Sequence, residues 1–208
     1  YYETETYTAM DHMLFPYGAG STLSLLEHIK KADARNKRVL VIGSQSPWVE
    51  SILLAAGASN ITTVEYSHID NDHPQIQTLL VLDFMRMYLN GTLGLFDVIV
   101  TYSSLEHSGL GRYGDELDPY GDIIAVASAW CVAKQGAKMV IGVPWGRSAP
   151  ADTIEFNLHR VYGPVRYPHL MANWKLEHVE PLRDLTVDDN LLRLKSSRTN
   201  NNEMRSQN

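Results

Sequence analysis

The chain has 208 residues, of which 44% are hydrophobic and 20% are charged, enough for one globular domain with a sizeable core. Its formal net charge of −6 argues against nucleic acid as a partner, because phosphate binding needs a basic face. No apolar run approaches the roughly 20 residues of a membrane span, and a single cysteine, Cys131, excludes an intrachain disulfide.

The first half of the chain alternates between helix and strand patterns. A helix is expected from near Ser21 to Asn36, followed by a continuous apolar strand, Val39–Ile42, that stops at Gly43. Pro47 suits the first turn of a second helix, which runs through Ala56. The β-branched run Ile61–Val64 predicts the next strand.

The alternation continues. Leu79–Leu82 predicts a third strand, with helix as an open alternative, and Val98–Val100 predicts a fourth. A helix is expected from about Pro119 to Lys134, and Lys138–Val143 predicts a fifth strand.

The end of the chain differs. Trp174–Val179 and Asn190–Lys195 alternate as a terminal strand pair, whereas residues 196–208 are polar and expected to be disordered. Strands that alternate with helices imply an α/β fold with a Rossmann-like doubly wound sheet, mostly parallel. We therefore predict a single domain over residues 1–195, with residues 1–18 as an N-terminal extension.

In such sheets ligands bind outside the carboxyl ends of the strands. Gly43 ends the first strand, where a glycine lets the chain turn and a ligand approach the backbone. The full G-x-G-x-x-G fingerprint is absent, so an ordinary strand–helix turn is an equal alternative.

Two carboxylates follow the next strands. Glu65 comes about twenty residues after Gly43, where an acid accepts hydrogen bonds from ribose hydroxyls, or it is an unpaired surface residue. Asp83 follows the third strand, where adenine is read in such folds, or it caps a helix.

The segment from Phe96 to Asp115 opens as a buried strand and ends as a loop rich in Gly, His, Arg and Asp. His107 follows the strand and could serve as a general base. Alternatively, His107, Asp115 and Asp118 could coordinate a divalent cation. For Arg112 we favour a structural role, in which it fastens the loop to Asp115 or Asp118.

A second His-Arg pair, His159 and Arg160, follows the fifth strand and is expected at the same edge of the sheet. The alternative is a helix on which Glu155 and His159 form an i,i+4 pair.

The order of these elements resembles the class I S-adenosylmethionine-dependent methyltransferases. The resemblance rests on the turn at Gly43, on Glu65, on Asp83 and on the string Ser-Leu-Glu-His at residues 104–107. It implies S-adenosylmethionine as cofactor and a terminal antiparallel strand pair.

A longer string, His-Ser-Gly-Leu-Gly-Arg-Tyr-Gly-Asp at residues 107–115, resembles an uncharacterised family with bacterial and nematode members. The pair Asp118-Pro119 and residues 157–163 belong to the same resemblance, which covers about residues 38–180. Bacterial relatives lie among surface-polysaccharide genes, which implies a sugar hydroxyl as acceptor.

The resemblance implies a role for each site residue. Cofactor contacts would come from Gly43, Ser44, Gln45, Glu65, Asp83 and Tyr102; the base would be His107; and acceptor contacts would come from Glu106, Arg112, Asp115, His159 and Arg160. The expected function is O-methylation of a sugar or another small hydroxyl acceptor. No metal is expected in the site.

One departure keeps an alternative open. The glycines of the usual first motif are replaced by Ser44, Gln45, Ser46 and Pro47, so the chain could instead be an inactive binding or scaffold domain. Neither the compartment nor the oligomeric state follows from the sequence.

Overall fold

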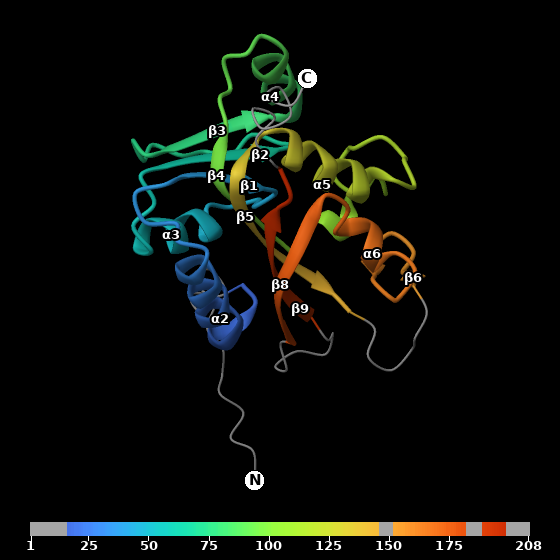
Figure 1. Cartoon of the computed structure of the whole chain (residues 1–208). Coiled ribbons are helices and arrows are strands. Elements are labelled where there is room, and N and C mark those ends of the chain that lie inside the picture. The colour runs from blue at the N-terminus through green and yellow to red at the C-terminus, as the bar shows by residue number, and fades with distance from the viewer. Residues whose placement is uncertain (1–15, 146–151, 182–188, 199–208) are drawn as a thin grey trace, which may run out of the picture.

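The computed structural model describes residues 16–145, 152–181 and 189–198. Its core is a seven-stranded sheet in the order β3-β2-β1-β4-β5-β9-β8 (Figure 1). The strands are β1 (Arg38–Ile42), β2 (Asn60–Glu65), β3 (Ile76–Leu80), β4 (Phe96–Tyr102), β5 (Ala133–Pro144), β8 (Trp174–Pro181) and β9 (Asp189–Ser196). Neighbouring strands are parallel from β3 through β2, β1 and β4 to β5, and β9 runs antiparallel to both β5 and β8. The predicted doubly wound sheet with a terminal antiparallel pair is confirmed.

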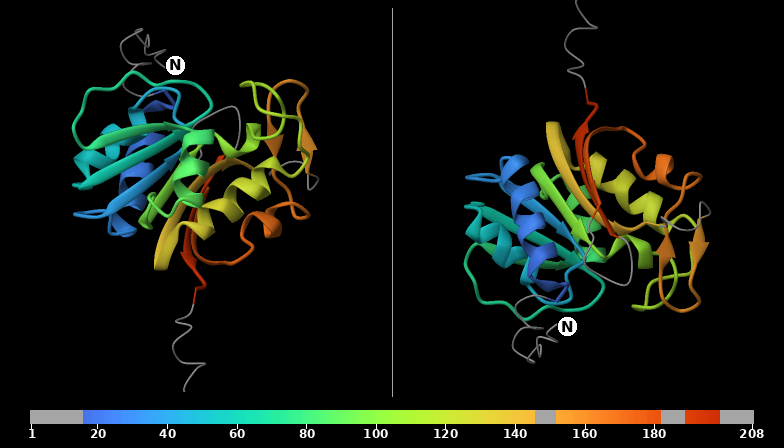
Figure 2. Two further views of the ribbon diagram at one scale, coloured as in Figure 1. Left: turned by 90° about the horizontal axis from the view of Figure 1, so that it is seen from above. Right: turned by 90° about the horizontal axis from the view of Figure 1, so that it is seen from below.

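Helices cover both faces of the sheet, as Figure 2 shows. The helical elements are α2 (Gly18–Lys31), α3 (Trp48–Ala55), α4 (Val81–Leu89), the 3-10 turn η1 (Leu105–His107), α5 (Gly121–Cys131) and α6 (Tyr167–Leu170). Helices α2 and α3 pack on one face, and α4, α5 and α6 pack on the other. A short hairpin, β6 (Thr153–Ile154) with β7 (Arg160–Val161), stands apart from the sheet. Among the described helices, none is long and apolar enough to cross a bilayer.

The strands form where the sequence is apolar on both sides of the pleat. Val39 and Val41 of β1 face the cluster under α2 and α3, and Leu40 between them faces the cluster under α5. All three side chains are at most 1% exposed. A strand buried on both faces reads as a continuous apolar run, which is why periodicity alone identified β1 and β4.

Two expectations need correction. The apolar run at 79–82 is divided, because β3 ends at Leu80 and α4 begins at Val81. Residues 155–159 form no helix: Asn157 has φ +51°, and Glu155 N–H donates to the carbonyl oxygen of His159 at 2.9 Å, which closes the β6–β7 turn. Left-handed backbone at an asparagine is typical of a tight turn.

Candidate active site

A cavity of about 120 Å³ lies at the carboxyl edge of the parallel strands. Five residues predicted to bind a cofactor line it together: Gly43, Ser44, Gln45, Glu65 and Tyr102. They come from the ends of β1, β2 and β4, which parallel pairing brings to one edge of the sheet. His107 and Asp115 line the same cavity.

A second cavity of about 620 Å³ adjoins the first, between α4 and α5. Gly43, Glu65 and Asp115 border both cavities. Its deeper walls are apolar and include Leu40, Phe84 and Ala129. The two cavities thus form one region that is polar at the sheet edge and apolar beneath α4 and α5.

The turn after β1 requires a glycine. Gly43 has φ +69°, and a Cβ atom there would lie 1.9 Å from Ser104 Oγ. The absence of a side chain lets the loop after β4 approach the end of β1, which closes the floor of the first cavity.

Glu65 ties this turn to the end of β2. Its Oε1 accepts hydrogen bonds from the backbone N–H groups of Ser44 and Gln45, each at 3.3 Å. These contacts are long for hydrogen bonds to a carboxylate. They hold the carboxylate at the cavity wall, where it borders both cavities.

Aromatic rings form one side of the cavity. Tyr17 lies 5.4 Å from Trp48 and 5.0 Å from Tyr102 between ring centroids, and Trp48 lies 5.4 Å from Tyr102. The described side chains that line the first cavity include two acids, Glu65 and Asp115, and no Lys or Arg. Carboxylates and aromatic faces both attract a cation, so the cavity favours a positively charged ligand group.

Tyr17 and Trp48 line the cavity but are not among the site residues predicted from the sequence. Tyr17 falls in the segment assigned to an N-terminal extension, and nothing in its neighbourhood predicts that α2 starts beside the cavity. Trp48 directly follows Pro47 in the turn after β1, and this position at the predicted ligand edge could have identified it as a lining residue.

A buried acid supports the turn from behind. Glu50, in the first turn of α3, is fully buried. Its Oε1 accepts the hydroxyl of Thr63 at 2.5 Å, and its Oε2 lies 2.8 Å from Ser44 Oγ. Ser44 Oγ also lies 2.6 Å from the carbonyl oxygen of Ser46, which can only accept. Ser44 has a single hydroxyl hydrogen, which it donates to the Ser46 carbonyl. Its contact with Glu50 is then a hydrogen bond only if Glu50 is protonated and donates to Ser44 Oγ. Burial raises the pKa of Glu50, which is consistent with that state.

His107 has a defined tautomer. Its Nδ1 lies 2.6 Å from the carbonyl oxygen of Leu158, which can only accept, so Nδ1 carries the hydrogen and Nε2 carries the lone pair. Burial lowers the pKa of His107, and the hydrogen bond to Leu158 opposes this shift. At neutral pH the ring is therefore an unprotonated base at the cavity wall.

The loop after η1 is tightly folded around Asp115. The carboxylate accepts hydrogen bonds from the backbone N–H groups of Gly109 at 2.6 Å and of Gly111 and Tyr113, each at 3.3 Å. A Cβ atom on Gly109, whose φ is +78°, would lie 2.0 Å from the carbonyl oxygen of Asp118. The glycine-rich string is thus explained by close backbone packing.

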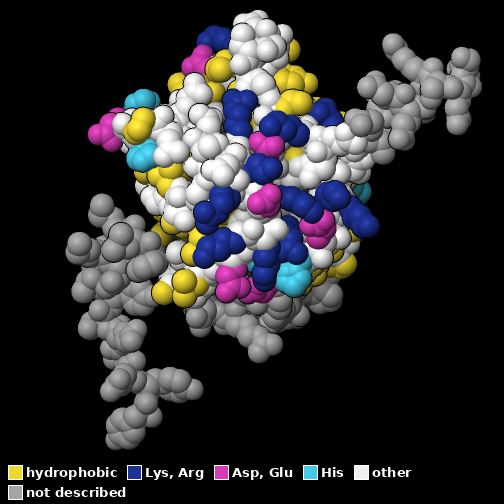
Figure 3. Space-filling view, turned by 60° about the vertical axis from the view of Figure 1, so that its left-hand side comes forward, with side chains coloured by type: hydrophobic (Ala, Val, Ile, Leu, Met, Phe, Trp, Pro, Cys, Tyr) yellow, Lys and Arg dark blue, Asp and Glu magenta, His cyan; other side chains and the backbone are white. Residues whose placement is uncertain are grey.

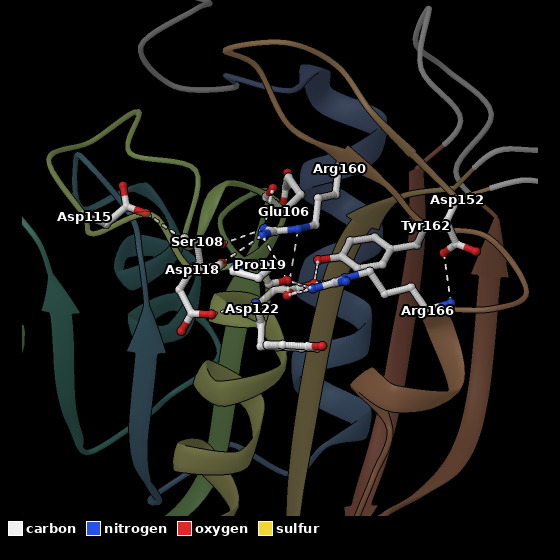
Figure 4. Close-up of polar contacts among 12 residues, drawn as sticks. Glu106, Ser108, Asp115, Asp118, Pro119, Asp122, Asp152, Arg160, Tyr162 and Arg166 are labelled. Atoms are coloured by element: carbon white, nitrogen blue, oxygen red, sulfur yellow. Dashed lines mark hydrogen bonds and ion pairs between the residues drawn. The ribbon is translucent and has the colours of Figure 1, made fainter.

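Arg160 holds this loop from inside, as Figure 4 shows. It is 1% exposed and donates to the carbonyl oxygens of Ser108 at 2.5 Å, Glu106 at 3.4 Å and Asp118 at 3.3 Å. Asp122, also fully buried, lies 3.9 Å from Arg160 Nε and accepts hydrogen bonds from Tyr162 and Arg166. One guanidinium therefore joins the loop after β4 to the β6–β7 hairpin.

Four of the predicted acceptor residues do not line either cavity. Glu106 and Arg160 are each 1% exposed; Glu106 Oε1 lies 3.9 Å from His107 Nε2, and Arg160 binds backbone carbonyls of the loop. Arg112 donates to the carbonyl oxygen of Asn157 at 2.6 Å, so it joins the loop to the β6–β7 turn and not to Asp115 or Asp118 as the structural alternative expected. The His159 ring is half-buried, 6.0 Å from that of His107. Of the five, Asp115 reaches the cavity.

Asp83, which was predicted to contact the cofactor, also lies outside both cavities. It lies in the first turn of α4, its side chain is 49% exposed, and it pairs with Arg86 at 2.9 Å. It lines neither cavity, because β3 ends three residues before it and α4 carries it away from the sheet edge.

The alternative metal site is not assembled. Within the described ranges, the group of His, Cys and acidic residues with metal-ligand spacing is His28, His178 and Glu180, not His107 with Asp115 and Asp118. His28 Nε2 already contacts Glu180 at 2.9 Å, and burial lowers the pKa of His28.

Comparison with solved structures identifies the fold as that of the class I S-adenosylmethionine-dependent methyltransferases. One similar structure is the 1,6-didemethyltoxoflavin-N1-methyltransferase of Burkholderia thailandensis with 1,6-didemethyltoxoflavin and S-adenosylhomocysteine bound. It has 10% identity and a TM-score of 0.66, over 88% of this chain and 81% of that chain. Another is the N-methyltransferase NodS of Bradyrhizobium japonicum WM9, with 14% identity and a TM-score of 0.61, over 88% of this chain and 98% of that chain.

The family is also defined. Residues 36–207 match the family described as Caenorhabditis protein of unknown function, DUF268, and the chain belongs to that family. No curated protein matches the sequence.

The glycine loop gives a first prediction. Gly109→Ala is expected to lower the free energy of unfolding by about 1–3 kcal/mol more than Gly114→Ala. Both positions have positive φ, but a Cβ on Gly114 meets nothing within 4 Å. Urea denaturation of the two variants measures the difference; equal losses would show that backbone strain alone, and not the contact with Asp118, requires the glycine.

Glu50 gives a second prediction. Because burial raises its pKa in the folded state, its contribution to stability is full below the unfolded pKa of about 4.3 and is lost as the pH rises through the folded value. The stability of the wild type relative to Glu50→Gln should therefore fall from acid to neutral pH. Urea denaturation over that range checks this, and a difference that does not change with pH would contradict a protonated Glu50.

Proposed function

We propose that the chain is an S-adenosylmethionine-dependent methyltransferase that acts on a hydroxyl of a small, uncharged or cationic acceptor such as a sugar. The observation that supports this most strongly is the juxtaposition in one cavity of Glu65, at the end of β2, with an unprotonated His107. The fold, shared with methyltransferases, supports the same proposal.

The residues present fit a sulfonium cofactor. Glu65 and the backbone of Gly43, Ser44 and Gln45 would hold its ribose and methionine portions, and Tyr102 would border it. The absence of Lys and Arg from the described lining, together with three aromatic rings, suits a cationic sulfur. Bound S-adenosylmethionine would supply the methyl group.

His107 would take the proton from the acceptor. Its Nδ1–H is held by the Leu158 carbonyl, so Nε2 is the nitrogen that receives a proton. A base is useful for a hydroxyl, which is a weak nucleophile until its proton leaves. Protonated His107 would be stabilised by Glu106, whose Oε1 lies 3.9 Å from Nε2.

The acceptor would enter beside Tyr113 and Asp115. The Tyr113 ring packs edge-on against His107 at 5.3 Å and is 39% exposed, which leaves apolar surface for a sugar ring. The Asp115 carboxylate disfavours phosphorylated or carboxylated acceptors by repulsion.

A second candidate function rests on the size of the polar cavity. Its volume of about 120 Å³ is below the roughly 300–1,000 Å³ of small-molecule sites. Ser44, Gln45 and Ser46 line this cavity at positions where the usual motif has glycines. A methyltransferase-like domain that binds a partner without catalysis is the function this observation favours.

Calorimetric titration with S-adenosylhomocysteine separates the two candidates. Binding is expected, and Glu65→Ala should weaken it about 10- to 100-fold, because a hydrogen bond to a charged group is lost. Glu155→Ala, an exposed acid outside both cavities, is the control and should bind as the wild type does. No heat and no thermal shift with the wild type would leave the non-catalytic function.

The base can be tested independently. NMR of the His107 ring should show the Nδ1–H tautomer and a titration midpoint below about 6.5, since burial lowers its pKa. Methyl transfer to a monosaccharide acceptor should rise with pH through that midpoint. His107→Gln should lower kcat by roughly 10²- to 10⁴-fold and leave S-adenosylhomocysteine affinity unchanged; an unaltered kcat would remove His107 as the base.

A further inference from the structure

The lysines of this chain are gathered at one end of the fold. Lys30 and Lys31 end α2, which leads directly into β1, so they lie at the amino edge of the parallel strands. Lys134 and Lys138 belong to the first half of β5. The other three lysines directly precede β1, begin β8 or end β9, and they lie at the same edge. The two cavities open at the opposite, carboxyl edge.

Three of these lysines form a row across neighbouring strands. Lys138 of β5 lies opposite Lys195 of β9, and Lys195 lies opposite Lys175 of β8. Residues directly opposite each other share a face of the sheet, and like charges in that arrangement destabilise it. The three ammonium groups therefore repel one another, and the pairing of β5, β9 and β8 holds them together.

The row continues toward α2. Arg193 lies two residues from Lys195 on the same face of β9 and opposite His178 of β8, whose ring lies 5.4 Å from that of His28 in α2. Lys31 lies about one helical turn beyond His28, at the end of α2. We call Lys30, Lys31, Lys138, Lys175, Arg193 and Lys195 the basic surface. Figure 3 shows Lys and Arg side chains in a band across one face of the molecule, with Asp and Glu side chains between them.

Among the described residues, Glu27 pairs with Lys31 at 3.8 Å, and Glu177 pairs with two further cations of the basic surface. Glu177 serves both Lys138, through an ion pair, and Arg193, at 3.5 Å. Lys30, Lys175 and Lys195 are exposed and form no ion pair with a carboxylate of the described residues. Because the whole chain has a net charge of −6, this concentration of positive charge is opposite in sign to the rest of the molecule.

We propose that the basic surface docks onto an anionic phospholipid bilayer. Five of its six cations are lysines, whose compact ammonium groups attract lipid phosphates without the fixed geometry of an arginine fork. Described aromatic side chains with large exposure, such as Tyr88, Tyr120 and Phe156, lie on other elements, so the surface offers no platform for stacking nucleobases. Docking through the amino edge leaves both cavities open to solvent, whatever reaction they perform.

The experiment is sedimentation of the full 208-residue chain with phosphatidylcholine vesicles, with and without phosphatidylserine. Binding is expected with phosphatidylserine and should weaken as salt rises, because screening shortens the range of the attraction. Lys195→Glu should lower the partition coefficient roughly tenfold or more. It should also raise Tm, because a carboxylate between Lys138 and Lys175 replaces repulsion by attraction.

Arg86→Glu is the matched control. It makes the same change in charge on an exposed side chain of α4, on another element, and should leave vesicle binding unchanged. Equal binding to both kinds of vesicle, or equal loss in both variants, would overturn the proposal. Binding to duplex or single-stranded nucleic acid that is tighter than binding to phosphatidylserine vesicles would overturn it as well.

Discussion

The buried guanidinium of Arg160 is the contact on which the candidate site depends. It binds the backbone carbonyls of the loop after β4 and pairs with Asp122 at the start of α5. A buried arginine is tolerated only when its charge and its donors are satisfied. The same hairpin that carries Arg160 supplies the Leu158 carbonyl, which fixes the tautomer of His107. Loop shape and candidate base are thus set by one structural unit.

Charge is distributed along the strand direction. The carboxyl edge holds Glu65 and Asp115 in a cavity without described lysines or arginines, and the amino edge holds the basic surface. This separation suits two different ligands, a cation at one edge and an anionic surface at the other. It also explains how a chain with a net charge of −6 can present a strongly basic face.

The sequence predicted most of the site that depends on strand order. Gly43, Glu65 and Tyr102 end parallel strands, and parallel pairing brings such positions together without further information. It misplaced Asp83, because an apolar run does not show where a strand ends and a helix begins. It missed Tyr17, whose place depends on how α2 packs over the end of β1.

By itself the sequence determined the doubly wound sheet and the positions of Gly43 and Glu65 at the ends of its strands, because these follow from local periodicity and order along the chain. Only the tertiary structure decided which polar residues face solvent and which face the interior. Arg160 and Glu106 were predicted to contact the acceptor, yet both are buried and line neither cavity. A charged side chain reads the same in sequence whether its partner is a ligand or a backbone carbonyl fifty residues away, and only packing distinguishes the two.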